Sequence, residues 1–229
     1  MIDVKNLTKK YDKFKAVDNI SLTALPGKIT VLLGTNGAGK STTIKSIANL
    51  LKHEGSIEIC GYKNDSIEAK KNFGYVSETP VLYNLLTIDE HIDFIGHAYK
   101  IDNYKEKADY YIKLFKLEDK RKTIAQELSK GMTQKLSMLL AMMIEPQALL
   151  VDEPMVGLDP QSIEDTLHIL KDIAHRGCAV LISTHIIDIV NDIYDEAYIM
   201  NKGKIVKHIR REELENESLK QYFFELTGD

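Results

Sequence analysis

The sequence predicts an α/β fold that is interrupted by a helical insert. The apolar run Ile29–Leu33 is rich in branched side chains, which is typical of a buried parallel strand. From about Pro80 to Glu145 the apolar residues instead follow a helical spacing. Apolar strands return after Pro146, so we expect one α/β core that carries the insert.

The first third of the chain reads as strands separated by turn residues. We expect strands within IDVKNL, ISLTAL, KITVLLG and GSIEICG. The third run ends at a glycine loop. A helix from about Lys40 to Leu51 should follow, because Ile44, Ile47, Ala48 and Leu51 form one apolar stripe.

The last third returns to alternating strands and helices. The apolar runs ALLVDEP and CAVLISTH both end in polar residues, and a helix from about Pro160 to Ala174 should separate them. A hairpin is expected around Asn201-Lys202-Gly203. A terminal helix should then dock through Leu214, Leu219, Phe223 and Leu226.

Composition narrows the classes of partner. The 229 residues are 44% hydrophobic and 28% charged, with a net charge of -4 and no basic stripe, so we expect no nucleic-acid surface. The longest apolar run, LLAMMI, is far shorter than the roughly 18 residues of a membrane span, and the N-terminus does not resemble a signal peptide. If the protein works at a membrane, another chain must cross it. Cys60 and Cys178 match no metal or redox spacing and read as small buried hydrophobes in a reducing compartment.

The strongest motif is GTNGAGKS, residues 34–41, which matches G-x-x-x-x-G-K-[ST] between an expected strand and an expected helix. The glycines let backbone amides wrap a phosphate chain at the positive end of the helix. Lys40 would pair with the β and γ phosphates, and the Ser41 hydroxyl would ligate Mg²⁺. The alternative is a glycine-rich turn with a chance lysine, which the correct flanks disfavour.

Polar residues follow two later apolar runs at the edge where ligands bind in open α/β sheets. Asp152 would hold Mg²⁺, directly or through water, and Glu153 would accept a proton from an attacking water. His185 should emerge at the same edge and contact the terminal phosphate. Alternatively, the first strand simply exits into a polar loop and His185 is a surface histidine.

The stretch LSKGM, residues 128–132, opens an apolar helix and has two interpretations. Ser129 can be an N-cap with Gly131 merely tolerated. Alternatively, the turn is an anion-binding surface where Gly131 exposes backbone N–H groups to a phosphate. The stretch alone does not choose between them.

In this order, the phosphate loop, helical insert, LSKGM, VDEP, GLD and STH resemble the nucleotide-binding subunit of an ATP-binding cassette (ABC) transporter. The resemblance covers essentially the whole chain. It implies a RecA-like P-loop NTPase core with an antiparallel β-subdomain near the N-terminus and an inserted α-helical subdomain. We therefore expect a single ATPase domain over 1–229, with core residues 1–77 and 146–229 and helical residues 78–145.

The resemblance also implies roles for individual residues. ATP would be bound by the phosphate-loop residues, with Tyr11 stacked on adenine, although Tyr11 could instead pack between loop and sheet. Glu153 resembles the general base and His185 the switch histidine. The residues expected to touch the nucleotide are Tyr11, Gly34, Asn36, Gly37, Ala38, Gly39, Lys40, Ser41, Thr42, Ser129, Gly131 and Asp159.

In the family, two subunits close head to tail. Ser129 and Gly131 would therefore meet the γ-phosphate bound by a second copy or a related ATPase. The stretch VGLD, residues 156–159, resembles the loop that links the two sites, with Asp159 at its key position.

Two departures from the family pattern point to one branch. The usual LSGGQ is LSKGM, with Lys130 and Met132 in place of a glycine and the glutamine. Glu78 stands where a glutamine normally senses the metal, so the metal set is Ser41, Glu78 and Asp152, although Glu78 could also be a solvated loop residue. Both departures resemble the drug and antibiotic exporters that have separately encoded permeases.

The resemblance implies ATP and Mg²⁺ as cofactors and membrane permease subunits as partners. The chain would then lie in the cytoplasm, on the inner face of the cell membrane. One alternative is a soluble ABC ATPase that acts on ribosomes, DNA or iron-sulfur assembly, although this chain has one cassette and no long coiled coil. A P-loop kinase would leave VDEP, GLD and STH unexplained.

Overall fold

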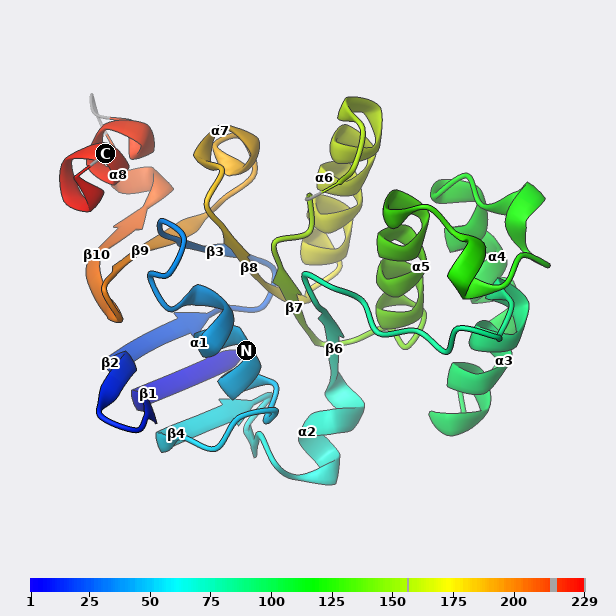
Figure 1. Ribbon diagram of the computed structural model, residues 1–229, viewed down its shortest axis with the longest axis horizontal. Coiled ribbons are helices and arrows are strands. Elements are labelled where there is room, and N and C mark those ends of the chain that lie inside the picture. The colour runs from blue at the N-terminus through cyan, green and yellow to red at the C-terminus, as the bar shows by residue number, and fades with distance from the viewer. Residues whose placement is uncertain (156, 215–217, 229) are drawn as a thin grey trace.

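The computed structural model describes residues 1–155, 157–214 and 218–228 and contains two β-sheets. The smaller sheet is antiparallel, with strand order β2-β1-β4-β5. Figure 1 shows β2, β1 and β4 side by side in that order. Its strands are β1 (Ile2–Tyr11), β2 (Phe14–Ala24), β4 (Glu54–Ile59) and β5 (Tyr62–Lys63). Alternation places Ile2 and Val4 inside, and a register shift at Asn6, whose φ is 52°, turns Leu7 inward as well.

The larger sheet has strand order β10-β9-β3-β8-β7-β6 and is parallel except for its edge strand β10. Every residue of β3, β7 and β8 is buried, which explains their continuous apolar sequences. The strands are β3 (Ile29–Leu33), β6 (Phe73–Val76), β7 (Ala148–Asp152), β8 (Ala179–Thr184), β9 (Glu196–Asn201) and β10 (Lys204–Arg210).

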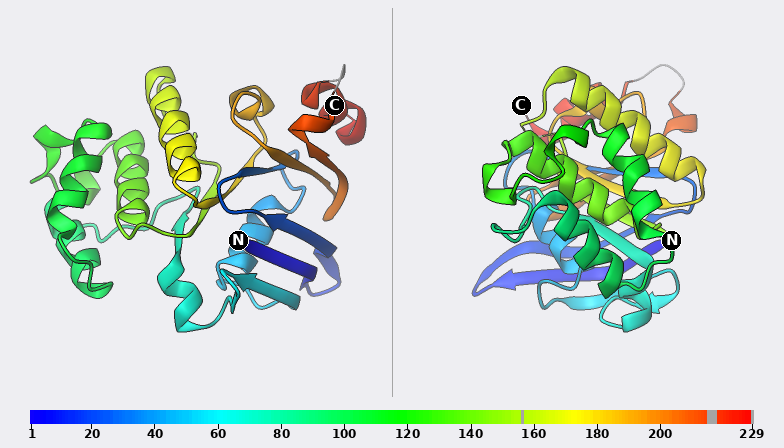
Figure 2. Two further views of the ribbon diagram at one scale, coloured as in Figure 1. Left: turned by 180° about the vertical axis from the view of Figure 1, so that it is seen from behind. Right: turned by 90° about the vertical axis from the view of Figure 1, so that its right-hand side faces the viewer.

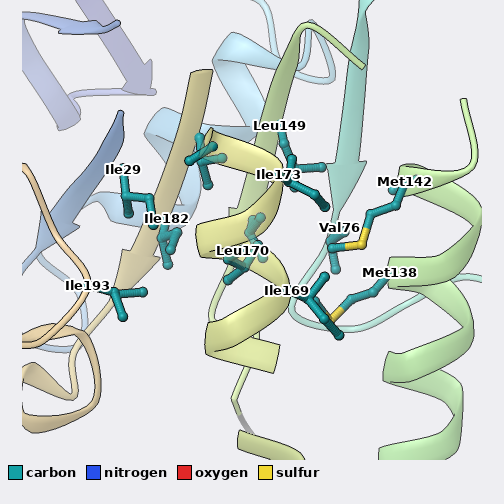
Figure 3. Packing of buried hydrophobic residues seen from close by; sticks show 14 of the residues in the cluster. Ile29, Val76, Met138, Met142, Leu149, Ile169, Leu170, Ile173, Ile182 and Ile193 are labelled. Carbon is teal, nitrogen blue, oxygen red and sulfur yellow. The ribbon is translucent and has the colours of Figure 1, made fainter. Parts of the chain in front are cut away.

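Two hydrophobic clusters cover the two faces of the larger sheet. On one face, α1 (Lys40–Ile47) lies against the antiparallel sheet and shares its cluster. The other face carries α6 (Pro160–His175) and the helices of the insert. Figure 3 shows Met138 and Met142 reaching from the insert toward Val76 and Ile169, so the insert is packed into the core.

The insert contains α3 (Ile88–Ala98), α4 (Tyr104–Leu114) and α5 (Lys130–Met142), gathered at one end of the molecule in Figure 2. Arg121 links α3 to α4, because its guanidinium donates to Asp89 on α3 at 2.7 Å and to Asp109 on α4 at 2.5 Å. The division at residues 78 and 145 stays a prediction. The short elements are α2 (Ile67–Asn72), α7 (Ile187–Val190), α8 (Leu219–Thr227) and three 3₁₀ turns, Glu118–Lys120, Ala125–Glu127 and Arg211–Glu213.

The hairpin expected around Asn201-Lys202-Gly203 is confirmed. Its two turn residues are Lys202 and Gly203, with φ of 46° and 80°, since Asn201 pairs with Lys204. Two other local expectations need correction. The helix α1 ends at Ile47 and not near Leu51, because Asn49 has a φ of 57° and turns the chain out of the helix. Cys60 is half-buried at a turn after β4, with a φ of 54°, and is not a buried strand residue.

The terminal helix docks as expected. Leu219 and Phe223 are buried, and Leu214 and Leu226 pack against the same cluster. None of the helices formed by the described residues combines the length and the apolar character that a membrane crossing requires.

Candidate functional site

A cavity of about 560 Å³ opens at the carboxyl edge of β3, β7 and β8, beside the N-terminus of α1. This is where the sequence placed most of the candidate residues. Its lining consists of Tyr11, Phe14, Ala16, Asn36, Gly37, Gly39, Lys40, Ser41, Thr42, Glu78, Glu153 and His185.

The loop before α1 has a backbone that its glycines alone allow. Gly39 has a φ of 109°, and a Cβ there would lie 2.5 Å from the Ala16 carbonyl oxygen. A Cβ on Gly34 would lie 2.5 Å from the Met200 carbonyl oxygen. The first turn of α1 contains no acidic residue, so its positive end is not neutralised within the helix. The loop therefore presents free amides and positive potential to the cavity.

Lys40 is 5% exposed and turns back onto its own loop. Its ammonium donates to the carbonyl oxygens of Gly34 at 2.9 Å and Thr35 at 3.3 Å. The same nitrogen lies 3.3 Å from Glu153 Oε1. The cation is thus fully engaged inside the cavity, and a bound phosphate would have to replace some of these contacts.

Asp152 is completely buried at the end of β7. Its Oδ1 accepts from Ser41 Oγ at 3.2 Å and from Ser183 Oγ, while Oδ2 has no hydrogen-bond partner among the residues that the structure describes. Burial raises the pKa of Asp152, the two serine hydrogen bonds oppose this, and the charges of Glu78 and Glu153 add to the rise. A hard cation beside Oδ2 would stabilise the carboxylate form, so this oxygen pair fits Mg²⁺.

The acidic residues do not form a metal cage by themselves. Within the part of the chain that the structure describes, no group of three or more His, Cys, Asp or Glu side chains could hold a metal ion. Mg²⁺ is commonly bound through one or two protein oxygens together with substrate phosphates. The donors Ser41 and Asp152, with Glu78 on the cavity wall, match that mode.

Glu153 is held in a strained conformation immediately after β7. Its φ is 47°, which costs a non-glycine residue on the order of 1 kcal/mol. The Glu153 amide donates to the Ser183 carbonyl at 3.0 Å and fixes the turn. The carboxylate, 6% exposed, has Oε1 at 3.0 Å from His185 Nδ1, although the angle is not that of a hydrogen bond. The two side chains are therefore in contact but are not hydrogen-bonded to each other.

Two aromatic residues form the outer wall of the cavity. Tyr11 is 47% exposed, and Lys9 Nζ lies 4.9 Å from its ring centroid. Phe14 pairs with Tyr11 across the β1–β2 turn and is 67% exposed. Phe14 was not singled out from the sequence, although an aromatic residue three positions after Tyr11 in a hairpin was the available signal. Ser183 was also missed as the partner of Asp152.

The signature residues lie outside this cavity. Ser129 caps α5, accepting from the Met132 amide at 3.3 Å, so the N-cap interpretation is confirmed for the single chain. Asp159 caps α6, accepting from the Ser162 hydroxyl at 2.5 Å and from the Ser162 amide at 3.0 Å, and these two hydrogen bonds lower the pKa of Asp159. A Cβ on Gly131 would lie 3.4 Å from the Gly157 carbonyl oxygen. Val156 lies outside the described residues.

Two phosphate-loop residues also serve the fold and not the cavity wall. Ala38 is buried, and its carbonyl accepts from the Gly203 amide at 2.9 Å. Gly34 packs under Met200. Both shape the loop that Lys40 and Ser41 occupy, and neither lines the cavity itself.

Comparison with known proteins gives one consistent answer. A family model described as ABC transporter matches residues 17–156. The ABC-type transporter ATP-binding protein EcsA of Bacillus subtilis is 36% identical over 210 residues, which is 90% of this chain and 85% of that protein. The SkfA peptide export ATP-binding protein SkfE of the same organism is 32% identical, covering 91% and 89% of the two chains.

The solved structures agree. The ATP-binding subunit of an ABC transporter superposes with a TM-score of 0.93 at 32% identity, covering 99% of both chains. The expected RecA-like P-loop α/β fold is thereby confirmed.

Proposed function

The chain belongs to the ABC transporter family and hydrolyses ATP, and we propose that it powers export through a separately encoded membrane permease. The assignment of the ATP-hydrolysing site rests on one observation. Five side chains converge at one edge of the sheet, namely Lys40, Ser41, Asp152, Glu153 and His185. Export is supported by the family branch and by relatives such as the peptide exporter ATPase.

The lining of the cavity can contact both the base and the phosphates of a nucleoside triphosphate. The adenine would stack on Tyr11, with Phe14 beside it on the same wall. The phosphates would lie along Asn36, Gly37 and Gly39 and meet Lys40. Thr42 and Ser41 face the same space from the first turn of α1.

Mg²⁺ would be held by Ser41 and Asp152, with Glu78 of the cavity lining as a third oxygen donor. When bound, it neutralises phosphate charge as the terminal phosphoryl group leaves. The uncompensated Asp152 Oδ2 supports this assignment. Glu78 brings a negative charge where the family has a neutral amide, which predicts a steeper dependence of nucleotide binding on Mg²⁺.

Glu153 is the side chain best placed to accept a proton from an attacking water. Its carboxylate is buried, faces the cavity and is not hydrogen-bonded to His185. His185 lies within 3.0 Å of it and would contact the terminal phosphate. The Glu153–Lys40 contact keeps the base next to the place where the phosphate arrives.

A second copy, or a related ATPase, would complete the site. Ser129 is exposed at the N-terminus of α5, a helix whose first turn has no acidic residue. Such an end attracts an anion, yet it lies outside this chain's own cavity. We therefore assign Ser129 and Gly131 to the γ-phosphate bound by the partner, with Asp159 in the loop between the two sites.

The permease would dock on the segment that links β6 to α3. This segment and α3 expose large apolar side chains, beside a hollow of about 260 Å³ between β6 and α5. The exposed residues are Val81, Tyr83, Leu85, Phe94 and Tyr99. Because Glu78 begins the same segment, docking and the metal end of the cavity are linked. The chain would then work on the cytoplasmic side of the membrane.

Affinity purification from membranes of the native host tests this proposal. The tagged chain should bring down a polytopic membrane protein, and the double substitution Val81→Asp, Leu85→Asp should lose it while retaining ATP binding. The matched substitution Phe224→Asp, an exposed apolar residue on α8, should leave the complex intact. Recovery of the chain without any membrane protein, together with ATPase activity stimulated by ribosomes or DNA, would replace export by the soluble alternative.

A further inference from the structure

A second cavity, of about 280 Å³, lies at the opposite edge of the larger sheet from the nucleotide site. It is bounded by the segments that precede β7 and β8, by the C-terminal end of α6, and by α4 and α5. β7 has five residues, so roughly 16 Å of strand separates the two cavities. Its buried walls are formed by Tyr111, Met142, Pro146, Ile173 and Cys178. They are largely apolar.

The Tyr111 hydroxyl is an unused donor in this cavity. Tyr111 is 7% exposed, and its hydroxyl forms no hydrogen bond with the residues that the structure describes. Tyr111 lines the cavity together with Arg176, Glu145 and Cys178. Its hydroxyl is therefore available to a ligand there. Burial raises the pKa of Tyr111, so the hydroxyl stays protonated and can donate.

Arg176 is exposed, lines the cavity and supplies a cation. Within residues 1–155, 157–214 and 218–228, no carboxylate forms a salt bridge with its guanidinium, although the charge of Asp172 acts on it. The guanidinium makes one long hydrogen bond of 3.4 Å to the Tyr110 hydroxyl and lies 5.9 Å from the centroid of that ring. Glu145, an acidic residue in the lining, forms an ion pair with Lys107 Nζ at 2.7 Å. Burial raises the pKa of the Cys178 thiol to about 12, so no thiolate opposes an anion.

We propose that this cavity binds a small carboxylic acid with an apolar body, of the size of benzoate or hexanoate. The carboxylate accepts hydrogen bonds from Arg176 and from the Tyr111 hydroxyl, and the body packs against Met142 and Ile173. A cavity of about 150 Å³ is enough for benzene, so the available 280 Å³ accommodates a ring and its carboxylate. Binding is non-covalent, because a carboxylate is not an electrophile toward the Cys178 thiol.

Because of the position of the cavity, a bound ligand would link the helical insert to the core. Tyr111 belongs to α4 of the insert, whereas Arg176 follows α6 on the core. One carboxylate that bonds both side chains joins these two parts of the molecule. A bound acid is therefore expected to raise the melting temperature of the chain.

Methyl NMR of the full chain labelled at methionine Cε provides the test, with benzoate and hexanoate as probes. Either probe should shift the Met142 resonance saturably with a Kd below about 5 mM, as expected for a ligand of this size. Benzyl alcohol, which lacks the charge, should bind at least tenfold more weakly. Arg176→Gln should weaken benzoate binding at least tenfold and Tyr111→Phe about threefold.

Arg210→Gln is the matched control, because Arg210 is a partly exposed arginine on β10, outside the walls of this cavity. It should leave benzoate binding unchanged, as should Lys40→Ala, whose defect lies in the nucleotide cavity. Absence of a saturable Met142 shift at 10 mM of both probes would overturn the assignment. So would equal binding of benzyl alcohol, or unaltered benzoate affinity of Arg176→Gln.

Discussion

At the residue scale, the charged side chains of the nucleotide cavity contact one another. Lys40 Nζ is engaged by two loop carbonyls and by Glu153, and Asp152 Oδ1 accepts from two serine hydroxyls. Asp152 Oδ2 has no hydrogen-bond partner among the described residues. Removing one partner of a buried ion pair leaves an uncompensated charge, which is strongly destabilising. We therefore expect ATP binding to exchange the Lys40 contacts for contacts to the phosphates.

Lys40→Ala is predicted to weaken ATP binding by at least tenfold, because a charge-assisted contact to the phosphates is removed. The substitution also leaves Glu153 without its cation, which adds repulsion toward the incoming phosphates. Titration with a fluorescent ATP analogue measures the effect. Lys45→Ala, in the last turn of α1, is the control on the same helix. Equal ATP affinity of the two variants would argue against the phosphate-loop assignment.

The raised pKa of Asp152 predicts that the stability of the folded chain depends on pH. Its pKa is raised in the folded state, so the folded chain holds its proton more tightly than the unfolded chain does. This contribution is fully present below the unfolded pKa of about 4 and is lost as pH rises through the folded pKa. Relative to the wild type, Asp152→Asn should gain stability as the pH rises above about 4, without Mg²⁺. Urea unfolding at several pH values measures it, and a constant difference would contradict the assignment.

At the element scale, the segment between β6 and α3 is held by a buried histidine. His91 is 3% exposed, its Nδ1 donates to the Thr87 carbonyl at 2.8 Å, and its Nε2 accepts from the Tyr83 amide at 3.0 Å. The helix behind it begins with a capping box between Thr87 and Glu90. The proposed docking segment is therefore fixed from its C-terminal side.

His91→Phe should release the Tyr83 amide, because the acceptor is removed while the ring volume is retained. Hydrogen exchange at Tyr83 should then be at least tenfold faster, whereas His91→Gln, which restores an acceptor, should return part of the protection. His97→Gln, near the exposed end of α3, should change nothing at Tyr83. Unchanged exchange in His91→Phe would show that other contacts hold the segment.

Strands with a continuous apolar sequence and helices with a clear N-terminal cap were predictable from the sequence. β3, β7 and β8 are apolar throughout because both of their faces are covered, and α6 begins at an Asp-Pro cap. Element ends were not predictable, because they depend on single backbone angles. Asn49 stops α1 and Lys202 enters a left-handed turn, and neither residue requires that conformation by its chemistry.

At the scale of the whole molecule, the site divides into a predictable and an unpredictable part. The motif residues Lys40, Ser41, Asp152 and Glu153 meet because parallel strands end at one edge. Phe14 had a signal in its place in the hairpin after Tyr11, whereas Ser183 could not be assigned from the sequence, since its role follows from which strands become neighbours. The same is true of the second cavity, which joins segments far apart in the chain.

ATP should drive two copies together, because Ser129 lies outside the cavity of its own chain and has an exposed, unneutralised helix end. Light scattering of the Glu153→Gln variant should show a dimer with ATP and a monomer with ADP. Adding Ser129→Tyr, which blocks the turn sterically, should abolish the dimer. Ser137→Tyr, later on α5, is the control on the same helix. An ATP-dependent dimer that tolerates Ser129→Tyr would remove that residue from the interface.

The most direct test of the whole account is the ATPase rate of the chain purified with its permease and reconstituted into lipid, comparing the wild type with Glu153→Gln. The wild-type complex should hydrolyse ATP, and the variant should retain the permease and ATP but turn over about 10²- to 10⁴-fold more slowly, because the positioned proton acceptor is lost. Near wild-type turnover by the variant, or no permease bound to either chain, would contradict the account.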